Sequence, residues 1–207
     1  MKKKKYGLTD RTVIVDNHVL HRIRALKDFG KVKKGDFGGY VETEDYLSQN
    51  GRSWIFNNAK VFGNALICED AMVFNNVKVF GSSQIYEDAR IYGHVAIWGS
   101  AHISGSAKVI GNAKIYENAY IYGKSLVYGN SCVCGSSHIC GHSHVYDNTV
   151  LSGDVWIRDA CICGNAILDG CFKVRNRTIS SGIWNKAVQI DHKWYLISTT
   201  LEKIYVE

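Results

Sequence analysis

Histidine and cysteine side chains are concentrated in one stretch of the chain, Cys132-Val-Cys-Gly-Ser-Ser-His-Ile-Cys-Gly-His-Ser-His144. An imidazole can act as a general base, and imidazole and thiolate are ligands that zinc prefers. We single out His138 and His144 as candidate catalytic bases that would deprotonate a hydroxyl or an amine. His142, which lies between them, is a candidate ligand-binding residue.

These residues lie within a hexapeptide repeat that spans residues 55–179. An Ile, Val or Leu recurs every six residues from Ile55 to Ile157, and the spacing resumes at Ile162 after one five-residue unit. The position two residues after each aliphatic residue is Gly, Asn, Asp or Glu. The position four residues after it is mostly a small residue. Alternation along a short strand points the aliphatic inward, and Gly or Asn tolerates the positive φ of a corner. The spacing of an amphipathic helix is absent.

The repeat therefore predicts an all-β fold in which three hexads close one triangular coil and residues 18 apart stack. Twenty-one hexads make about seven coils. The pattern resembles the left-handed parallel β-helix of the hexapeptide-repeat superfamily, which contains many trimeric acyltransferases. The resemblance implies the left hand, a homotrimer, and acetyl-CoA or another acyl-CoA as cofactor.

Both ends of the chain leave the hexad pattern. Residues 1–54 are expected to form an N-terminal cap with a β-hairpin at 12–26 around Asp16-Asn17, and residues 180–207 a β-rich C-terminal cap with a turn at Asp191-His192. The segments Ile23-Arg-Ala-Leu-Lys-Asp-Phe29, Val32-Lys-Lys-Gly-Asp-Phe-Gly-Gly-Tyr-Val41 and Leu47-Ser-Gln-Asn-Gly-Arg-Ser-Trp-Ile55 resemble the cap of YdcK-type hexapeptide proteins. Those are bacterial and phage proteins labelled as acyltransferases, so the resemblance implies common ancestry.

Stacking at 18-residue intervals brings ring-bearing side chains into one column on the surface. This histidine column contains His102, Tyr120, His138 and Trp156 at successive coil heights. Its rings could bind a flat ligand or hold a general base. The alternative is a surface ladder without a ligand, which we favour for each histidine taken alone.

The same stacking argues against a metal site in the stretch 132–144. It places the possible ligands on three different faces: Cys132 and Cys134, then His138 and Cys140, then His144. They cannot converge on one ion, so we expect no metal. Across coils, the five-residue unit should instead stack His144 on Cys161 and Tyr146 on Cys163.

The outward positions of one face are apolar along most of its length. This first-face ladder consists of Phe56, Phe74, Tyr92, Ile110, Tyr128 and Tyr146. A contiguous apolar stripe marks an interface, and we predict that it forms the trimer. The competing interpretation is that aromatic residues simply suit outward strand positions.

Charge and composition limit the partners and the cellular compartment that the sequence predicts. The chain has a net charge of +6, and residues 1–54 carry +5 of it. We favour a solvated end over an anionic partner there, although a small anionic ligand remains open. Nucleic acid is not expected, and no apolar run is long enough to span a membrane. Seven cysteines without paired spacing predict reduced thiols in the cytoplasm.

Three functions remain open from the sequence. The first is acyl-CoA-dependent O- or N-acyl transfer at clefts between subunits, with His138 or His144 as base and Trp156 near the cofactor. Two segments resemble acyltransferase motifs: Gly141-His-Ser-His-Val-Tyr-Asp-Asn148 resembles a histidine-bearing coil, and Gly153-Asp-Val-Trp-Ile157 a turn of acetyl-CoA enzymes. The second is a non-catalytic trimer that binds a small anionic ligand such as a nucleotide signal. The third is a structural or protein-binding rod. No loop protrudes from the repeat, which favours the last two.

Overall fold

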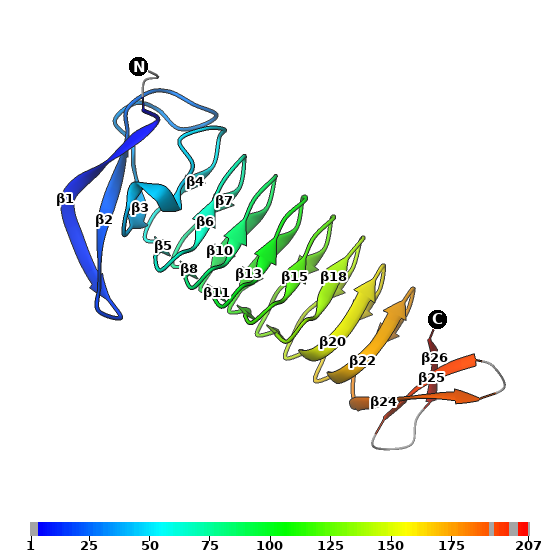
Figure 1. The fold of residues 1–207 in the computed structure, drawn as a ribbon. Helices are drawn as coiled ribbons and strands as arrows, with labels where there is room; N and C mark the ends of the chain where they lie inside the picture. The colour runs from blue at the N-terminus through cyan, green and yellow to red at the C-terminus, as the bar shows by residue number, and fades with distance from the viewer. Residues whose placement is uncertain (1–3, 191–192, 199–202, 207) are drawn as a thin grey trace.

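The computed structural model describes residues 4–190, 193–198 and 203–206. These residues form a straight rod of stacked coils with a β-hairpin across its N-terminal end (Figure 1). Strands of successive coils pair in parallel, and the rod has about eight turns. The predicted all-β parallel β-helix is therefore confirmed.

Each coil contributes one strand to each of three faces. The first face consists of β4 (Trp54–Ile55), β7 (Met72–Val73), β10 (Arg90–Gly93), β13 (Lys108–Gly111), β16 (Leu126–Val127), β19 (His144–Val145), β21 (Cys161–Ile162) and β23 (Thr178–Ile179). The second face consists of β5 (Lys60–Val61), β8 (Lys78–Val79), β11 (Ala96–Ile97), β14 (Lys114–Ile115), β17 (Cys132–Val133) and the first residues of β20 (Val150–Arg158) and β22 (Ile167–Arg175).

The third face carries most of the predicted site residues. It consists of β6 (Leu66–Ile67), β9 (Gln84–Ile85), β12 (His102–Ile103), β15 (Tyr120–Ile121), β18 (His138–Cys140) and the last residues of β20 and β22. Because β20 and β22 each run on from the second face to the third, the last coils have long continuous strands there.

The N-terminal segment pairs directly with the first coil. Strands β1 (Tyr6–Val15) and β2 (His18–Ala25) form an antiparallel hairpin whose turn residues, Asp16 and Asn17, both have positive φ. Strand β3 (Phe37–Val41) pairs antiparallel with β2 and in parallel with β5. A short 3₁₀ helix, η1 (Glu44–Tyr46), follows. Strand β3 thereby covers the edge of β5 that the first coil would otherwise expose, and the hairpin extends the sheet from β3.

Parallel pairing extends beyond the hexads on both sides. Leu47 already bridges Ile67 in parallel, and at the other end Ile183 of β24 (Ile183–Ile190) pairs with Ile167. These flanking segments explain why the rod has about eight turns where the hexad count predicted seven. Strands β25 (Lys193–Ser198) and β26 (Lys203–Val206) continue antiparallel from β24. The predicted Asp191-His192 turn lies outside the described residues.

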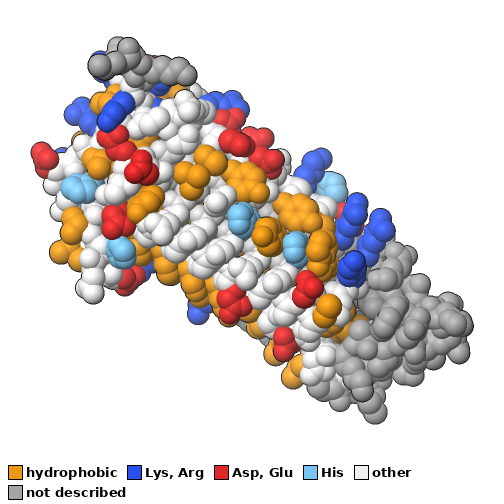
Figure 2. Space-filling view, in the orientation of Figure 1, with side chains coloured by type: hydrophobic (Ala, Val, Ile, Leu, Met, Phe, Trp, Pro, Cys, Tyr) orange, Lys and Arg blue, Asp and Glu red, His pale blue; other side chains and the backbone are white. Residues whose placement is uncertain are grey.

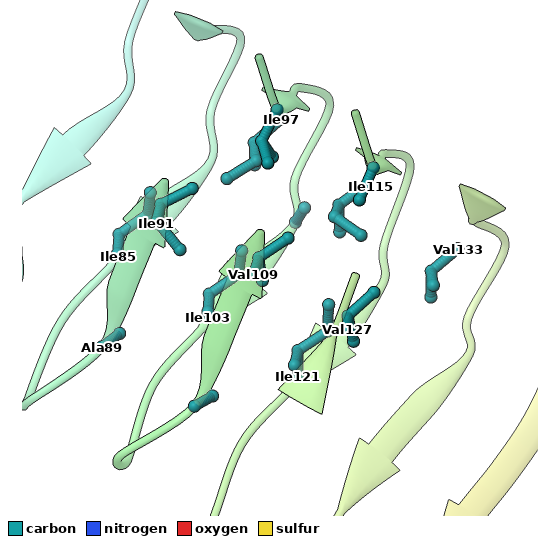
Figure 3. Close-up of a cluster of buried hydrophobic side chains, with 14 of the residues drawn as sticks. Ile85, Ala89, Ile91, Ile97, Ile103, Val109, Ile115, Ile121, Val127 and Val133 are labelled. Atoms are coloured by element: carbon teal, nitrogen blue, oxygen red, sulfur yellow. The ribbon is translucent and has the colours of Figure 1, made fainter. Parts of the chain in front are cut away.

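The core is a stack of the repeat's aliphatic side chains (Figure 3). Ile85, Ile103 and Ile121 lie one above another and are completely buried. Burial of each such side chain stabilises the fold by roughly 1.5–3 kcal/mol. Four of the small inward residues are serines whose hydroxyl donates to a carbonyl of its own corner, as from Ser83 Oγ to Phe80 O at 2.7 Å; the others are Ser125, Ser137 and Ser143. These buried hydroxyls are thereby satisfied, whereas Ser131 Oγ is buried without a partner among the described residues.

Charged corner residues are tolerated because their side chains bond the neighbouring coil. Glu117 has a φ of 58°, and its Oε2 accepts a hydrogen bond from the backbone N–H of Gly135 at 2.6 Å. Asp147 accepts in the same way from Gly164 N–H at 3.0 Å. The carboxylate thus offsets part of the strain of a left-handed corner that glycine would adopt freely.

In the part of the chain that the structure describes, no helix has the length and apolar character needed to cross a bilayer. All seven cysteines fall within that part, and each is a free thiol.

Candidate functional site

The histidine column forms as the register predicts. His102 pairs with Tyr120, Tyr120 with His138, and His138 with Trp156 in parallel register across four coils. Their rings stack nearly parallel, with centroid distances of 4.9, 4.7 and 3.9 Å in that order. The ring spacing follows the spacing of the strands, so the backbone itself sets this stack.

His138 is the most enclosed imidazole of the column. It is half-buried between Tyr120 and Trp156, and Tyr122 adds an edge contact at 6.3 Å. Its Nδ1 is buried and has no hydrogen-bond partner among the described residues. Burial lowers the pKa of His138 below its usual value, against a smaller opposing effect of Asp154. The imidazole is therefore neutral and able to accept a proton. The same burial also destabilises the imidazolium that forms once the proton has been accepted.

The ring faces of the column are already occupied by one another. A flat ligand inserted between two rings would need about 7 Å between them, twice a van der Waals contact, and the observed spacings are shorter. At the C-terminal end, the Lys173 ammonium lies 5.4 Å from the Trp156 centroid. On the face shown in Figure 2, histidine side chains alternate with hydrophobic ones along the middle of the rod, and Lys and Arg gather toward its C-terminal part. A ligand would meet ring edges rather than ring faces.

His142 and His144 lie elsewhere, at the corner that leads onto the first face. As predicted, His144 pairs with Cys161 across the five-residue unit. A second five-residue unit separates Val174 from Ile179, and Cys161 pairs with Thr178. Two successive coils thus have one residue fewer at this corner than the coil that bears His142. The shortened corners leave a hollow beside the two histidines.

This His144 hollow has a volume of about 400 Å³. It is lined by His142, His144, Asp159, Ala160, Cys161, Asn176, Arg177 and Thr178. Asp159 Oδ1 accepts a hydrogen bond from His142 N–H at 2.8 Å, and this bond holds the pKa of the carboxyl below its usual range. The ionised carboxylate places negative charge where a histidine would become positive on accepting a proton.

Cys161 in the hollow is not set up as a nucleophile. Its thiol donates to Tyr146 Oη at 3.6 Å, and burial raises the pKa of the thiol. The reactive thiolate is therefore disfavoured near neutral pH. The reactive and charged groups of the hollow are therefore the two imidazoles, the Asp159 carboxylate and the exposed Arg177 guanidinium.

The structure divides the predicted residues into two groups. His102, Tyr120, His138 and Trp156 share the column, whereas His142 and His144 share the hollow. Sequence reasoning missed Asp159, Asn176 and Arg177 as neighbours of His144. The signal available for them was the second five-residue unit, which repeats the shortened corner in the next coil.

The first-face ladder is also stacked, although not along its whole length. Phe56, Phe74 and Tyr92 stack at 4.4 and 4.6 Å, and Tyr128 stacks on Tyr146 at 4.7 Å, with Ile110 between the two groups. Within the described residues, no group of three or more His, Cys, Asp or Glu side chains is arranged to hold a metal ion.

Comparison with known proteins gives one partial match. The "Uncharacterized acetyltransferase YdcK" of Escherichia coli (strain K12) is 42% identical over 52 residues. These residues are 25% of this chain, and the match spans 16% of that protein's length. No protein-family model matches the chain.

Proposed function

We propose that this β-helix protein is an acyl-CoA-dependent acyltransferase whose reaction takes place in the His144 hollow. The observation that carries the proposal is the recessed corner, which opens two imidazoles, a carboxylate and a guanidinium onto one space of about 400 Å³. The partial match to a protein named an acetyltransferase supports the same class of reaction. A shortened corner here takes the place of the protruding loop that the repeat lacks.

In this proposal the His144 imidazole is the general base. It takes the proton from a hydroxyl or amine of the acceptor as that group attacks the thioester carbonyl of the acyl-CoA. The negative charge that develops on the carbonyl oxygen faces the Arg177 guanidinium, and the Asp159 carboxylate compensates the imidazolium. Collapse of the tetrahedral intermediate breaks the carbon–sulfur bond. The imidazolium returns the proton to the CoA thiolate, so CoA and the acylated acceptor leave.

The quaternary structure that fits this site is a homotrimer through the first-face ladder. His144 of β19 and Tyr146, which follows this strand, flank the buried Val145 and point outward from the same face. A subunit packed against the ladder would therefore border the hollow and close its open side. The column would then be structural, with Trp156 contributing stacking rather than cofactor contacts. The seven free thiols support a cytoplasmic location, and the cap resemblance supports a bacterial or phage origin.

Turnover with acetyl-CoA tests the proposal. The protein is incubated with acetyl-CoA and a panel of amines, amino sugars and sugar hydroxyls, and free CoA is separated chromatographically because the protein's own thiols would confuse a thiol reagent. His144→Gln should reduce kcat by a factor on the order of 10²–10⁴. His94→Gln, at an exposed histidine remote from the hollow, should leave kcat unchanged.

Two results would reject the proposal. One is wild-type turnover in His144→Gln, which would reject His144 as the base and move the reaction out of the hollow. The other is binding of acetyl-CoA with no release of CoA for any acceptor, which would leave non-catalytic binding of an anionic ligand in its place. Absence of binding as well would favour the structural rod.

A further inference from the structure

A second hollow lies on the first face at the N-terminal end, where the cap loop at Gly30 and Lys31 forms part of its lining. This cap-side groove has a volume of about 600 Å³. Its lining consists of Gly30, Lys31, Arg52, Phe56, Asp70, Met72, Phe74, Asp88, Arg90, Tyr92 and Lys108. It shares no residue with the His144 hollow, and on the first face β16 lies between Lys108 of the groove and His144 of the hollow. The groove is within the range of volumes that ligand sites of small molecules occupy.

Positive charge in the groove exceeds what its carboxylates neutralise. Arg52 is paired with Asp70: its backbone N–H and its Nε each donate to that carboxylate at 2.9 Å. Arg90 Nη1 donates to a thioether, Met72 Sδ, at 2.9 Å. Throughout the described residues, neither Lys31, Arg90 nor Lys108 forms an ion pair. Asp88 is the remaining carboxylate of the lining.

The other wall of the groove is aromatic. Phe56, Phe74 and Tyr92 form a stack with spacings of 4.4 and 4.6 Å and interplanar angles of 6° and 7°. Their faces are occupied by one another, so the groove receives their edges. Aromatic edges carry partial positive charge and pack favourably against the face of another ring. The three stacked edges together form an apolar strip longer than a bicyclic base.

We propose that the cap-side groove binds a nucleotide, with the base lying across the edges of the three rings and the phosphates between Arg90, Lys108 and Lys31. The arrangement favours a ligand that has both a base and phosphates. The unpaired cations select phosphate over a neutral nucleoside, and the aromatic wall selects a flat base over phosphate alone. The site is independent of acyl transfer. In the proposed trimer it would lie at the subunit contact, with the base between these ring edges and the neighbouring subunit.

Titration calorimetry with ADP as the probe tests this site on the full-length protein. The affinity for ADP should exceed that for adenosine and that for pyrophosphate by about tenfold or more each. Lys108→Met should weaken ADP binding by about tenfold. Lys114→Met is the matched control, because Lys114 is equally exposed at the same hexad position of the second face. It should leave the affinity unchanged. Tyr92→Leu should weaken ADP but not pyrophosphate.

Light scattering of each variant separates loss of the site from loss of assembly. The proposal is overturned if ADP does not bind, if the two lysine variants weaken it equally, or if pyrophosphate binds as tightly as ADP. The last result would indicate an anion site without base recognition. Retention of ADP binding in Lys108→Met together with Arg90→Met would place the nucleotide elsewhere.

Discussion

The imidazole of His138 and the indole of Trp156 stack at a centroid distance of 3.9 Å with an interplanar angle of 13°. The contact arises because parallel register sets residues 18 apart side by side on neighbouring coils. The indole is itself fixed by a hydrogen bond from its Nε1 to Asp154 Oδ1 at 3.0 Å. The stack shields His138 from water, and that burial is the main cause of its lowered pKa.

Trp156→Ala should therefore raise the pKa of His138 toward the ordinary value of about 6.5. Trp156→Phe is the control, because it keeps an aromatic ring over the imidazole. NMR titration of the histidine ring protons measures both variants. Since the folded-state pKa lies below the unfolded one, His138 makes stability rise with pH up to about 6.5, and Trp156→Ala should reduce that rise. An unchanged pKa in the Ala variant would refute burial by Trp156 as its cause.

At the Glu117 corner, two substitutions separate the contribution of the carboxylate hydrogen bond to stability from that of backbone strain. Glu117→Ala removes the hydrogen bond to Gly135 but keeps a Cβ at positive φ, and it should lower the free energy of unfolding by about 1 kcal/mol. Glu117→Gly removes the bond and also the strain, so it should be less destabilising. Denaturant unfolding measures both. The explanation of the corners would be contradicted if Glu117→Gly were less stable than Glu117→Ala.

A buried lysine ties the N-terminal cap to the first coil. Lys5 is 1% exposed, and its ammonium donates to Ser53 O at 3.0 Å, to Ser53 Oγ at 3.1 Å and to Asn50 O at 3.3 Å. Burial, assisted by Lys27, lowers the pKa of Lys5 from 10.5 to about 8. The folded protein thus holds this proton less tightly than the unfolded chain does.

By linkage, Lys5 makes stability rise between pH 8 and 10.5, by up to about 3 kcal/mol. Buried tyrosines and cysteines with raised pKa values act in the opposite direction over part of this range, so the comparison must be between wild type and Lys5→Met. The stability of wild type relative to Lys5→Met should increase across this interval in chemical denaturation. A constant difference would show that the ammonium is not desolvated.

The first-face ladder should hold the trimer together. Tyr92→Glu combined with Tyr128→Glu would place carboxylates in an apolar contact, where desolvation of each charge is unfavourable. Light scattering should give a trimer for wild type and a monomer for the double variant. Tyr86→Glu with Tyr122→Glu, on the third face, controls for added charge. A monomeric wild type would remove the proposed subunit contact.

The register of the β-helix was predictable because its signal is the same at every coil. The stacking of His138 on Trp156 and of His144 on Cys161 follows from counting residues. Only one alignment of neighbouring coils keeps the Ile and Val positions pointing inward. The hairpin turn at Asp16-Asn17 was equally readable from two residues that tolerate positive φ.

The two hollows were not predictable, because each depends on residues far apart in the sequence. Arg177 reaches the histidine corner only because two coils in succession are shortened there. The cap-side groove exists because the loop at Gly30 and Lys31 packs beside Arg52 and lines one space with residues of β7 and β10, and nothing in the hexad pattern directs a loop onto one face rather than another. The aromatic residues of the first-face ladder predicted an interface, but they did not indicate the cationic residues that line the groove beside them.

Binding of acetyl-CoA to wild type and to Arg177→Met tests the central claim that the His144 hollow is the acyl-CoA site. Because CoA itself carries an adenine nucleotide that the cap-side groove would also bind, both proteins also carry Lys108→Met. Titration calorimetry should then show one site per subunit with Arg177 in place. The affinity should fall about tenfold or more in Arg177→Met, where a charged contact is lost, and should be unchanged in Arg90→Met, whose guanidinium lies in the cap-side groove. Equal affinity of wild type and Arg177→Met, or loss of binding in Arg90→Met alone, would contradict it.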